Sequence, residues 1–187
     1  ALGGWSLDAH TRDAAPEVTS TGTSLRVHSP ENTARRQEWT LFLPRDQIRS
    51  IGIQANAGAA DVNVTGATLQ SLSIQANAAD TRVMAADADI GSLSVQANAA
   101  RARITAGGDG AILLEVNAST VELCVPPTAG LTVVVKDGFA FVTNLDERDL
   151  TQTGDTWQRT GSGGPTILVQ LEGNFSTFTL DPEGGCA

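Results

Sequence analysis

Histidine, cysteine and closely spaced acidic residues are the side chains of this chain that could support catalysis or hold a metal ion. The two histidines, His10 and His28, both lie in the polar N-terminal part, and neither is near a nucleophile motif. Asp87 and Asp89 form the closest carboxylate cluster, and paired carboxylates are the groups that cleave polysaccharides. They flank Ala88 just before an apolar segment, where turn chemistry accounts for them. The spacing therefore favours a turn over a catalytic site.

Motifs for cofactors and metal ions are missing from the sequence. There is no phosphate-binding Gly-rich loop, no Cys-x-x-Cys and no His-rich tract. A calcium site at Asp87 and Asp89 is the remaining alternative, although the Gly-Asp repeats of calcium-loaded β-rolls are absent. We therefore expect no catalytic residue, no cofactor and no metal, and a protein that is not an enzyme.

Charged side chains return at fixed positions of a sequence repeat. One position holds Asp61, Arg82, Arg103 and Glu122, and a second holds Asp80 and Arg101. If the repeats stack, Asp61 lies over Arg82 and Arg103 over Glu122, while the two arginines oppose one another. Solvated ladder pairs of this kind contribute about 0.2–1 kcal/mol each. A sharper alternative is an anion site at the Arg82–Arg103 pair.

The two cysteines, Cys124 and Cys186, are too few to define a disulfide framework. Cys124 lies in the last apolar segment before two prolines, as expected for a small core or strand residue. A Cys124–Cys186 disulfide that clamps the tail is the alternative, and it would require an oxidising compartment. Cys186, next to the terminus, could equally be a free thiol.

A repeat of 21 residues positions all of these side chains. The phrase Ile-Gln-Ala-Asn-Ala starts at Ile53, returns at Ile74 and again, with valine first, at Val95; a degraded copy starts at Leu114, 19 residues later. Such a period marks a solenoid, in which each unit buries its apolar face by stacking on the next. Period-two alternation within each unit predicts at least two short strands. Equivalent residues would then lie about 4.8 Å apart.

Asparagine occupies one position in every copy, at Asn56, Asn77, Asn98 and Asn117. These side chains could point inward and bond amide to amide as a structural ladder. Alternatively, the asparagines form corners in the left-handed backbone region, which the flanking alanines and Gly58 favour. Both interpretations are structural and not functional.

We therefore expect one all-β domain over residues 1–187, a β-solenoid with rungs of about 21 residues and hairpin caps at both ends. Residues 1–47 form an N-terminal segment with an entry hairpin, residues 48–137 the repeat stack, and residues 138–187 the C-terminal strands and cap. In the N-terminal flank we expect residues 1–22 to be irregular, followed by a hairpin of Ser24–His28 with Glu38–Leu43 around Ser29–Asn32. After the repeats we expect strands Leu131–Val135 and Gly138–Val142 around a turn at Lys136–Gly138. A polar excursion over Asn144–Gly164 and a hairpin of Thr166–Leu171 with Phe175–Leu180 then end the chain.

Aromatic residues are confined to the two ends of the chain, because a slim stack of Ala, Val and Leu has little room for large rings. We expect most of them to cap the open ends of the stack, and a ligand site made by Trp39 or Trp157 is the alternative. They are Trp5, Trp39, Phe42, Phe139, Phe141, Trp157, Phe175 and Phe178.

Composition limits the partners. A formal charge of −9 over 187 residues argues against nucleic acid and against anionic membrane surfaces. No run of about 18 apolar residues is present, so we expect no membrane insertion within this sequence. The chain starts at Ala1 without Met, from which we expect a part of a longer protein.

Several segments together resemble a known bacterial family. They are the entry Trp39–Pro44, the repeated Leu-x-Ile units, the exit Val121–Pro126, and Trp157 followed by a terminal hairpin. This pattern, over roughly residues 24–182, resembles the toastrack β-solenoid domains, also called putative-adhesin or cell-envelope-stress-type domains. The resemblance implies an extracytoplasmic or membrane-tethered module without catalytic residues, although this chain has Asn where such repeats have Gly.

A leucine-rich repeat is the competing fold, because Leu69-x-x-Leu72-x-Ile74-x-x-Asn77 fits its core pattern. It requires an apolar residue two positions after the asparagine, where this chain has Ala79 in that copy and Gly, Ala or Ser in the others. On function, the sequence favours a non-catalytic module that binds or senses a protein or glycan partner. The alternative is a structural module whose open ends join copies of the same chain.

Overall fold

The computed structural model describes residues 5–10, 15–21, 24–28, 38–44, 47–136 and 140–186. The chain divides into two compact units, Ala1–Ile48 and Arg49–Ala187, which we call the N-terminal unit and the solenoid unit. The division has a physical reason: each described sheet is built from strands of one unit, and the 21-residue repeat starts only in the second.

The N-terminal unit consists of short antiparallel strand pairs. Strand β1 (Ser6–His10) pairs with β4 (Glu38–Phe42), and β2 (Glu17–Thr21) pairs with β3 (Ser24–His28). The prediction that residues 1–22 are irregular is therefore wrong, as is the predicted pairing of Ser24–His28 with Glu38–Leu43. Only two residues separate β2 from β3, which makes that pair the more local hairpin. The turn predicted at Ser29–Asn32 lies outside the described residues.

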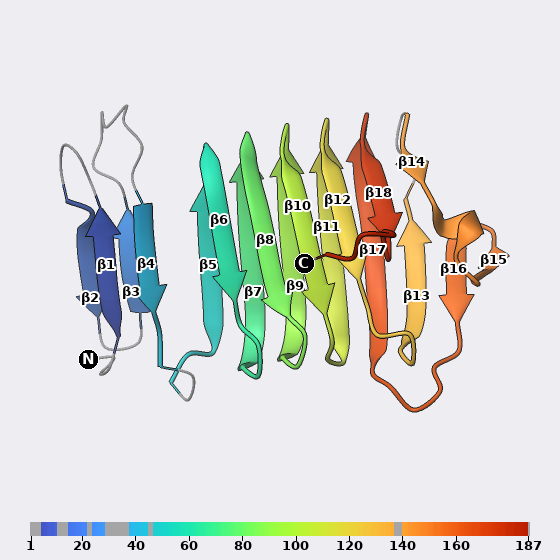
Figure 1. Ribbon diagram of the computed structural model, residues 1–187, viewed down its shortest axis with the longest axis horizontal. Helices are drawn as coiled ribbons and strands as arrows, with labels where there is room; N and C mark the ends of the chain where they lie inside the picture. The colour runs from blue at the N-terminus through green and yellow to red at the C-terminus, as the bar shows by residue number, and fades with distance from the viewer. Residues whose placement is uncertain are drawn as a thin grey trace. The chain divides into compact units, whose positions relative to one another are not determined.

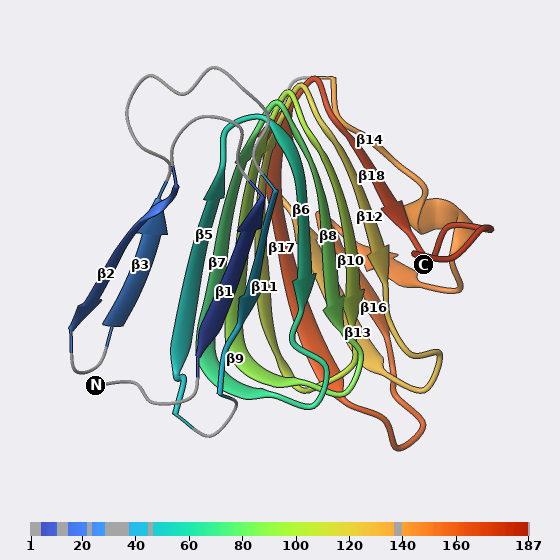
Figure 2. The ribbon, with the colours of Figure 1, turned by 60° about the vertical axis from the view of Figure 1, so that its left-hand side comes forward.

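The solenoid unit is built from two largely parallel sheets that face each other, as Figures 1 and 2 show. Each rung contributes one strand to an eight-stranded sheet and the next strand to a six-stranded sheet. The rungs are β5 (Ser50–Ala55) with β6 (Gly58–Asn63), β7 (Thr68–Asn77) with β8 (Ala79–Ala85), β9 (Asp89–Asn98) with β10 (Arg101–Ala106), β11 (Gly110–Asn117) with β12 (Thr120–Cys124), and β17 (Thr166–Asn174) with β18 (Thr177–Leu180).

Residues one repeat apart lie side by side, so the predicted β-solenoid is confirmed. Ile53 is in register with Ile74, Ile74 with Val95, and Val95 with Leu114. In the opposite sheet Val83 is in register with both of its neighbours in the column, and it is fully buried. Inward positions alternate with outward ones along each strand, which places one apolar column of each sheet against the other.

The last rung differs from the sequence-based prediction. Strands β17 and β18 were expected to pair as a hairpin, but each pairs in parallel with an earlier rung instead: β17 with β11 and β18 with β12. The chain leaves the stack after β12, forms β13 (Gly130–Val135) one place further out, and returns to insert β17 between β11 and β13. Phe178 of β18 is fully buried in this rung, so its ring belongs to the core.

The excursion over 144–164 covers the outer edge of the last rungs. It contains a short 3-10 helix η1 (Leu145–Glu147) and the antiparallel strands β15 (Thr151–Thr153) and β16 (Thr156–Arg159), and β16 pairs with β13. The Trp157 indole donates a hydrogen bond to Asp146, 2.9 Å away, which ties this hairpin to the 3-10 helix.

The six-stranded sheet has its own edge. The Asn144 side chain bonds both the N–H and the C=O of Leu180, and thus satisfies backbone groups at that edge. In place of the strand predicted at Gly138–Val142, the structure has a two-residue strand β14 (Val142–Thr143) beside β18; residues 137–139, which include most of the predicted turn and Phe139, lie outside the described residues. The described helices include none that is long and apolar enough to span a membrane.

Candidate functional site

Asparagine side chains form a continuous amide ladder along one corner of the solenoid. Each side-chain N–H of one rung donates to the amide oxygen of a neighbouring rung, at 3.1 Å from Asn77 to Asn56 and 3.0 Å from Asn98 to Asn77. Asn117 and Asn174 continue the ladder at 3.2 and 3.4 Å. The side chains are half-buried or exposed, so the ladder runs along the surface and not through the core.

The residue directly after the asparagine makes the corner in four of the five rungs, whereas in the first rung the positive φ falls on Gly58, two positions after Asn56. Ala78, Ala99 and Ala118 have φ near +50°, as does Phe175 after Asn174. The prediction that the asparagines adopt the left-handed region is therefore wrong. An asparagine at the end of a strand keeps extended geometry for its amide pairing, and the small alanine accepts the left-handed strain.

Asn98→Ala is expected to lower the free energy of unfolding by about 1 kcal/mol, because it removes two amide hydrogen bonds and leaves the Asn77 amide oxygen and the Asn117 amide N–H without their ladder partner at a half-buried corner. Urea denaturation measures the effect. Asn56→Ala is the matched control: Asn56 ends the ladder and has one neighbouring rung, so we expect about half the loss. Equal stability of Asn98→Ala and the unmodified protein would show that the ladder contributes nothing.

Sequence reasoning missed Asn174 and two serines that support the same corner. The Ser119 hydroxyl lies 2.8 Å from the Asn117 carbonyl oxygen and accepts the Ala100 N–H at 3.0 Å; Ser176 lies equally close to the Asn174 carbonyl. The signal was present, because Leu-Glu-x-Asn-x-Ser-Thr starts at both Leu114 and Leu171. The two copies start 57 residues apart, so a repeat with a period near 21 does not bring them into line.

A disulfide joins Cys124 to Cys186 and holds the C-terminal tail against the six-stranded sheet. Cys186 is 4% exposed, and no free cysteine is present among the described residues. Asp181 secures the same tail: its carboxylate accepts the Val125 N–H at 2.9 Å, and its own N–H donates to the Leu123 carbonyl. The tail is thus fixed by covalent and polar contacts with one strand end.

The charged columns lie on the outer face of the six-stranded sheet in the predicted order. Arg82 is in register with Asp61 on one side and with Arg103 on the other. Arg103 donates from Nε to Glu122 at 3.0 Å, in a pair whose side chains are about one-quarter exposed. Asp61, Asp80, Arg82 and Arg103, together with Ala59, line a shallow depression in this face.

The groups considered for catalysis belong to two different units of the chain. Asp87 lies exposed in the turn after β8, and Asp89 begins β9. His10 and His28 lie in the N-terminal unit, each beside an exposed carboxylate of Asp8 or Glu17. The described residues contain no cluster of three side chains that could hold a metal ion.

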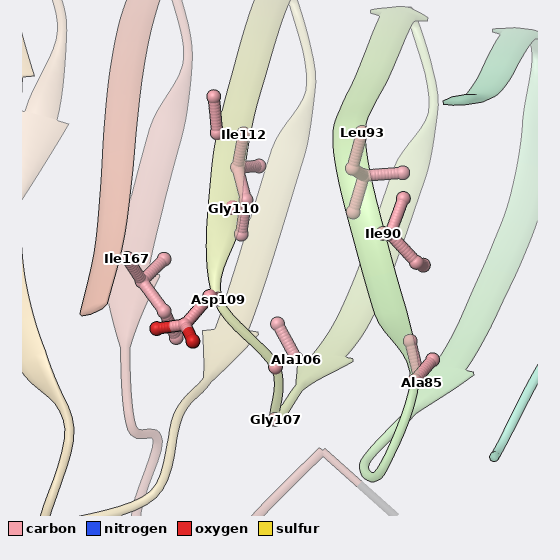
Figure 3. A pocket seen from close by; sticks show the side chains of 12 residues that line it. Ala85, Ile90, Leu93, Ala106, Gly107, Asp109, Gly110, Ile112 and Ile167 are labelled. Atoms are coloured by element: carbon pink, nitrogen blue, oxygen red, sulfur yellow. The ribbon is translucent and has the colours of Figure 1, made fainter. Parts of the chain in front are cut away.

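An apolar crevice opens where the third rung is two residues shorter than the others. Figure 3 shows the side chains of Ile90, Ile112 and Ile167 around it, beside the turn at Gly107. A Cβ at Gly107 would lie 1.4 Å from the Ala86 carbonyl oxygen, so the short turn requires glycine. The free volume is about 20 Å³, room for about one water molecule, which identifies the crevice as a packing gap and not a ligand site.

Comparison with known proteins finds one solved structure with a similar fold. No family model and no curated protein matches the sequence. A solved structure described as a putative cell adhesion protein from Clostridium sporogenes is similar, with a TM-score of 0.59 at 12% sequence identity. The match covers 94% of this chain and 80% of that chain. At this identity the likeness shows a shared fold.

Proposed function

We propose that this chain is a non-catalytic, adhesin-like binding or sensing module of a bacterial cell-envelope protein, placed outside the cytoplasm and tethered to the membrane in the full-length protein. Within that class, we propose a toastrack-type domain. The observation that carries the proposal is the similarity in fold, over 94% of the chain, to a protein described as a putative cell adhesion protein.

Two features of the solenoid unit support an extracytoplasmic role. The Cys124–Cys186 disulfide is a bond that persists in oxidising surroundings and is rare in the cytosol. The stack also presents regularly spaced outer faces on a hydrogen-bonded scaffold, and solenoid proteins use the extended surfaces of their stacked repeats for binding. A rigid face loses little conformational entropy when a partner binds.

An array of immobilised bacterial-envelope saccharides and proteins tests the proposal. We expect the purified protein to bind a restricted set of these partners, and to remain one monomeric species in light scattering as its concentration rises. Assemblies that grow with concentration, without binding to the array, would contradict this proposal and favour the structural, self-assembling alternative.

A further inference from the structure

We infer that the depression on the six-stranded sheet binds the carboxylate of an acidic sugar, a uronic-acid unit of an extracellular polysaccharide. The depression is lined by Asp61, Asp80, Arg82 and Arg103. This inference rests on the proposed binding function and names the ligand class for one surface. It is argued from which of these four charged side chains have an ion-pair partner and which do not.

The parallel register forces two arginines next to each other. Arg82 and Arg103 are cross-strand neighbours on adjacent rungs, and like charges in such positions destabilise a sheet. Arg103 is partly neutralised by Glu122, whose carboxylate accepts a hydrogen bond from Nε–H and leaves the terminal NH₂ groups of Arg103 free of that contact. A pair of adjacent guanidinium groups is relieved by an anion that bonds to both.

Arg82 lacks the protein partner that its position offers. Its in-register neighbour is Asp61, but among the described residues no carboxylate lies within 4.0 Å of the Arg82 guanidinium, and no side-chain hydrogen bond engages it. Arg82 is nonetheless half-buried. A half-buried guanidinium without a partner retains its full hydrogen-bonding capacity for a ligand, and its planar fork matches a carboxylate.

The two aspartates define what the rest of the ligand must be. Asp61 and Asp80 are exposed and, like Arg82, take part in no ion pair of the described residues. The four lining charges sum to zero, so a ligand with several negative charges would be repelled by the two carboxylates. A ligand with a single carboxylate flanked by hydroxyl groups fits both kinds of lining side chain, because its hydroxyls donate hydrogen bonds to the aspartates while its carboxylate accepts them from the arginines. A uronic acid has this arrangement.

Binding of a galacturonic-acid trimer, measured by calorimetric titration, tests the inference, with the neutral galactose trimer and acetate as comparison probes. We expect the acidic trimer to bind about tenfold more tightly than either, and Arg82→Ala to weaken it by about tenfold. Arg101→Ala is the matched control. It removes the same charge from the same outer face, but Arg101 does not line the depression, so binding should change by less than about twofold.

The double variant Asp61→Ala with Asp80→Ala separates a sugar from a simple anion. We expect it to weaken binding of the acidic trimer and to strengthen binding of acetate, because alanine removes both the acceptors for the sugar hydroxyls and the repulsion of the carboxylate. Thermal unfolding checks that each variant folds, and Arg82→Lys, which keeps the charge but loses the fork, replaces Arg82→Ala if that variant does not fold.

Three results would overturn the inference: equal losses from Arg82→Ala and Arg101→Ala, equal affinity for the neutral trimer or acetate, and no binding of the acidic trimer. Array binding by the unmodified protein, together with no binding of the acidic trimer, would refute this site while leaving the proposed binding function intact.

Discussion

Val83→Asp is expected to destabilise the solenoid unit by several kcal/mol, the largest effect of any single substitution considered for this chain. Val83 is fully buried in the six-stranded sheet and has an in-register neighbour on each side, Val62 and Ile104. An aspartate there would place a carboxylate between two aliphatic side chains, where no described cation could pair with it. Chemical denaturation followed by circular dichroism measures the loss.

Met84→Asp is the matched control for this substitution. Met84 is the next residue of the same strand, and the period of two turns its side chain to the outer face, where it is partly exposed. We expect a change within about 0.5 kcal/mol. Leu93→Asp, in the facing sheet, should repeat the large loss, since Leu93 is 3% exposed. Similar unfolding midpoints for Val83→Asp and Met84→Asp would refute the assignment of inward and outward faces.

The contrast between these neighbouring positions explains why the stack could be predicted from sequence. In a solenoid, equivalent positions of successive repeats share one environment. The similar apolar residues Ile53, Ile74 and Val95 therefore indicate that shared environment by residue type alone. The columns of charge followed from the same register, including the opposed pair Arg82 and Arg103. Both predictions needed the spacing of equivalent residues and no knowledge of tertiary contacts.

Features that depend on the choice between pairing partners could not be predicted in this way. Strand β3 can pair with either flanking strand, and the alternation in its sequence is satisfied by both. Strand β17 has the apolar pattern of a hairpin strand, yet the solenoid offers it a longer parallel partner in β11. The inserted residues between β12 and β17 separate the last rung from its repeat, so the pattern alone does not reveal where the chain returns.

The candidate site illustrates the same limit. Sequence spacing indicated that Arg82 and Arg103 are neighbours, but not that Arg82 lacks a partner while Arg103 has one. That difference depends on side-chain geometry: Glu122 reaches Arg103, whereas Asp61, with a side chain one carbon shorter than glutamate, does not reach Arg82. Because the Asp61 side chain is short, Arg82 stays without an ion-pair partner, and the ligand proposal rests on this cation.

Removing the disulfide is expected to have the second largest effect. The Cys124–Cys186 bond closes a loop between residues 62 apart in sequence, and it holds the end of the chain that forms the last rung. A loop of that length restricts the unfolded chain by about 4 kcal/mol in the loop-entropy relation, and engineered removals commonly cost about 2–5 kcal/mol. We therefore expect Cys124→Ser with Cys186→Ser to lower the free energy of unfolding by about 2–4 kcal/mol.

Reduction provides the matched control, because it breaks the same bond without changing the sequence. Dithiothreitol should lower the urea midpoint of the unmodified protein to that of the double variant and leave the double variant unchanged. The fold should survive in both, since β18 remains paired with β12 and Asp181 still accepts the Val125 N–H. A double variant that unfolds at the midpoint of the oxidised protein would contradict the stabilising role of the bond. Two reactive thiols in the denatured, unreduced protein would show that the bond is absent.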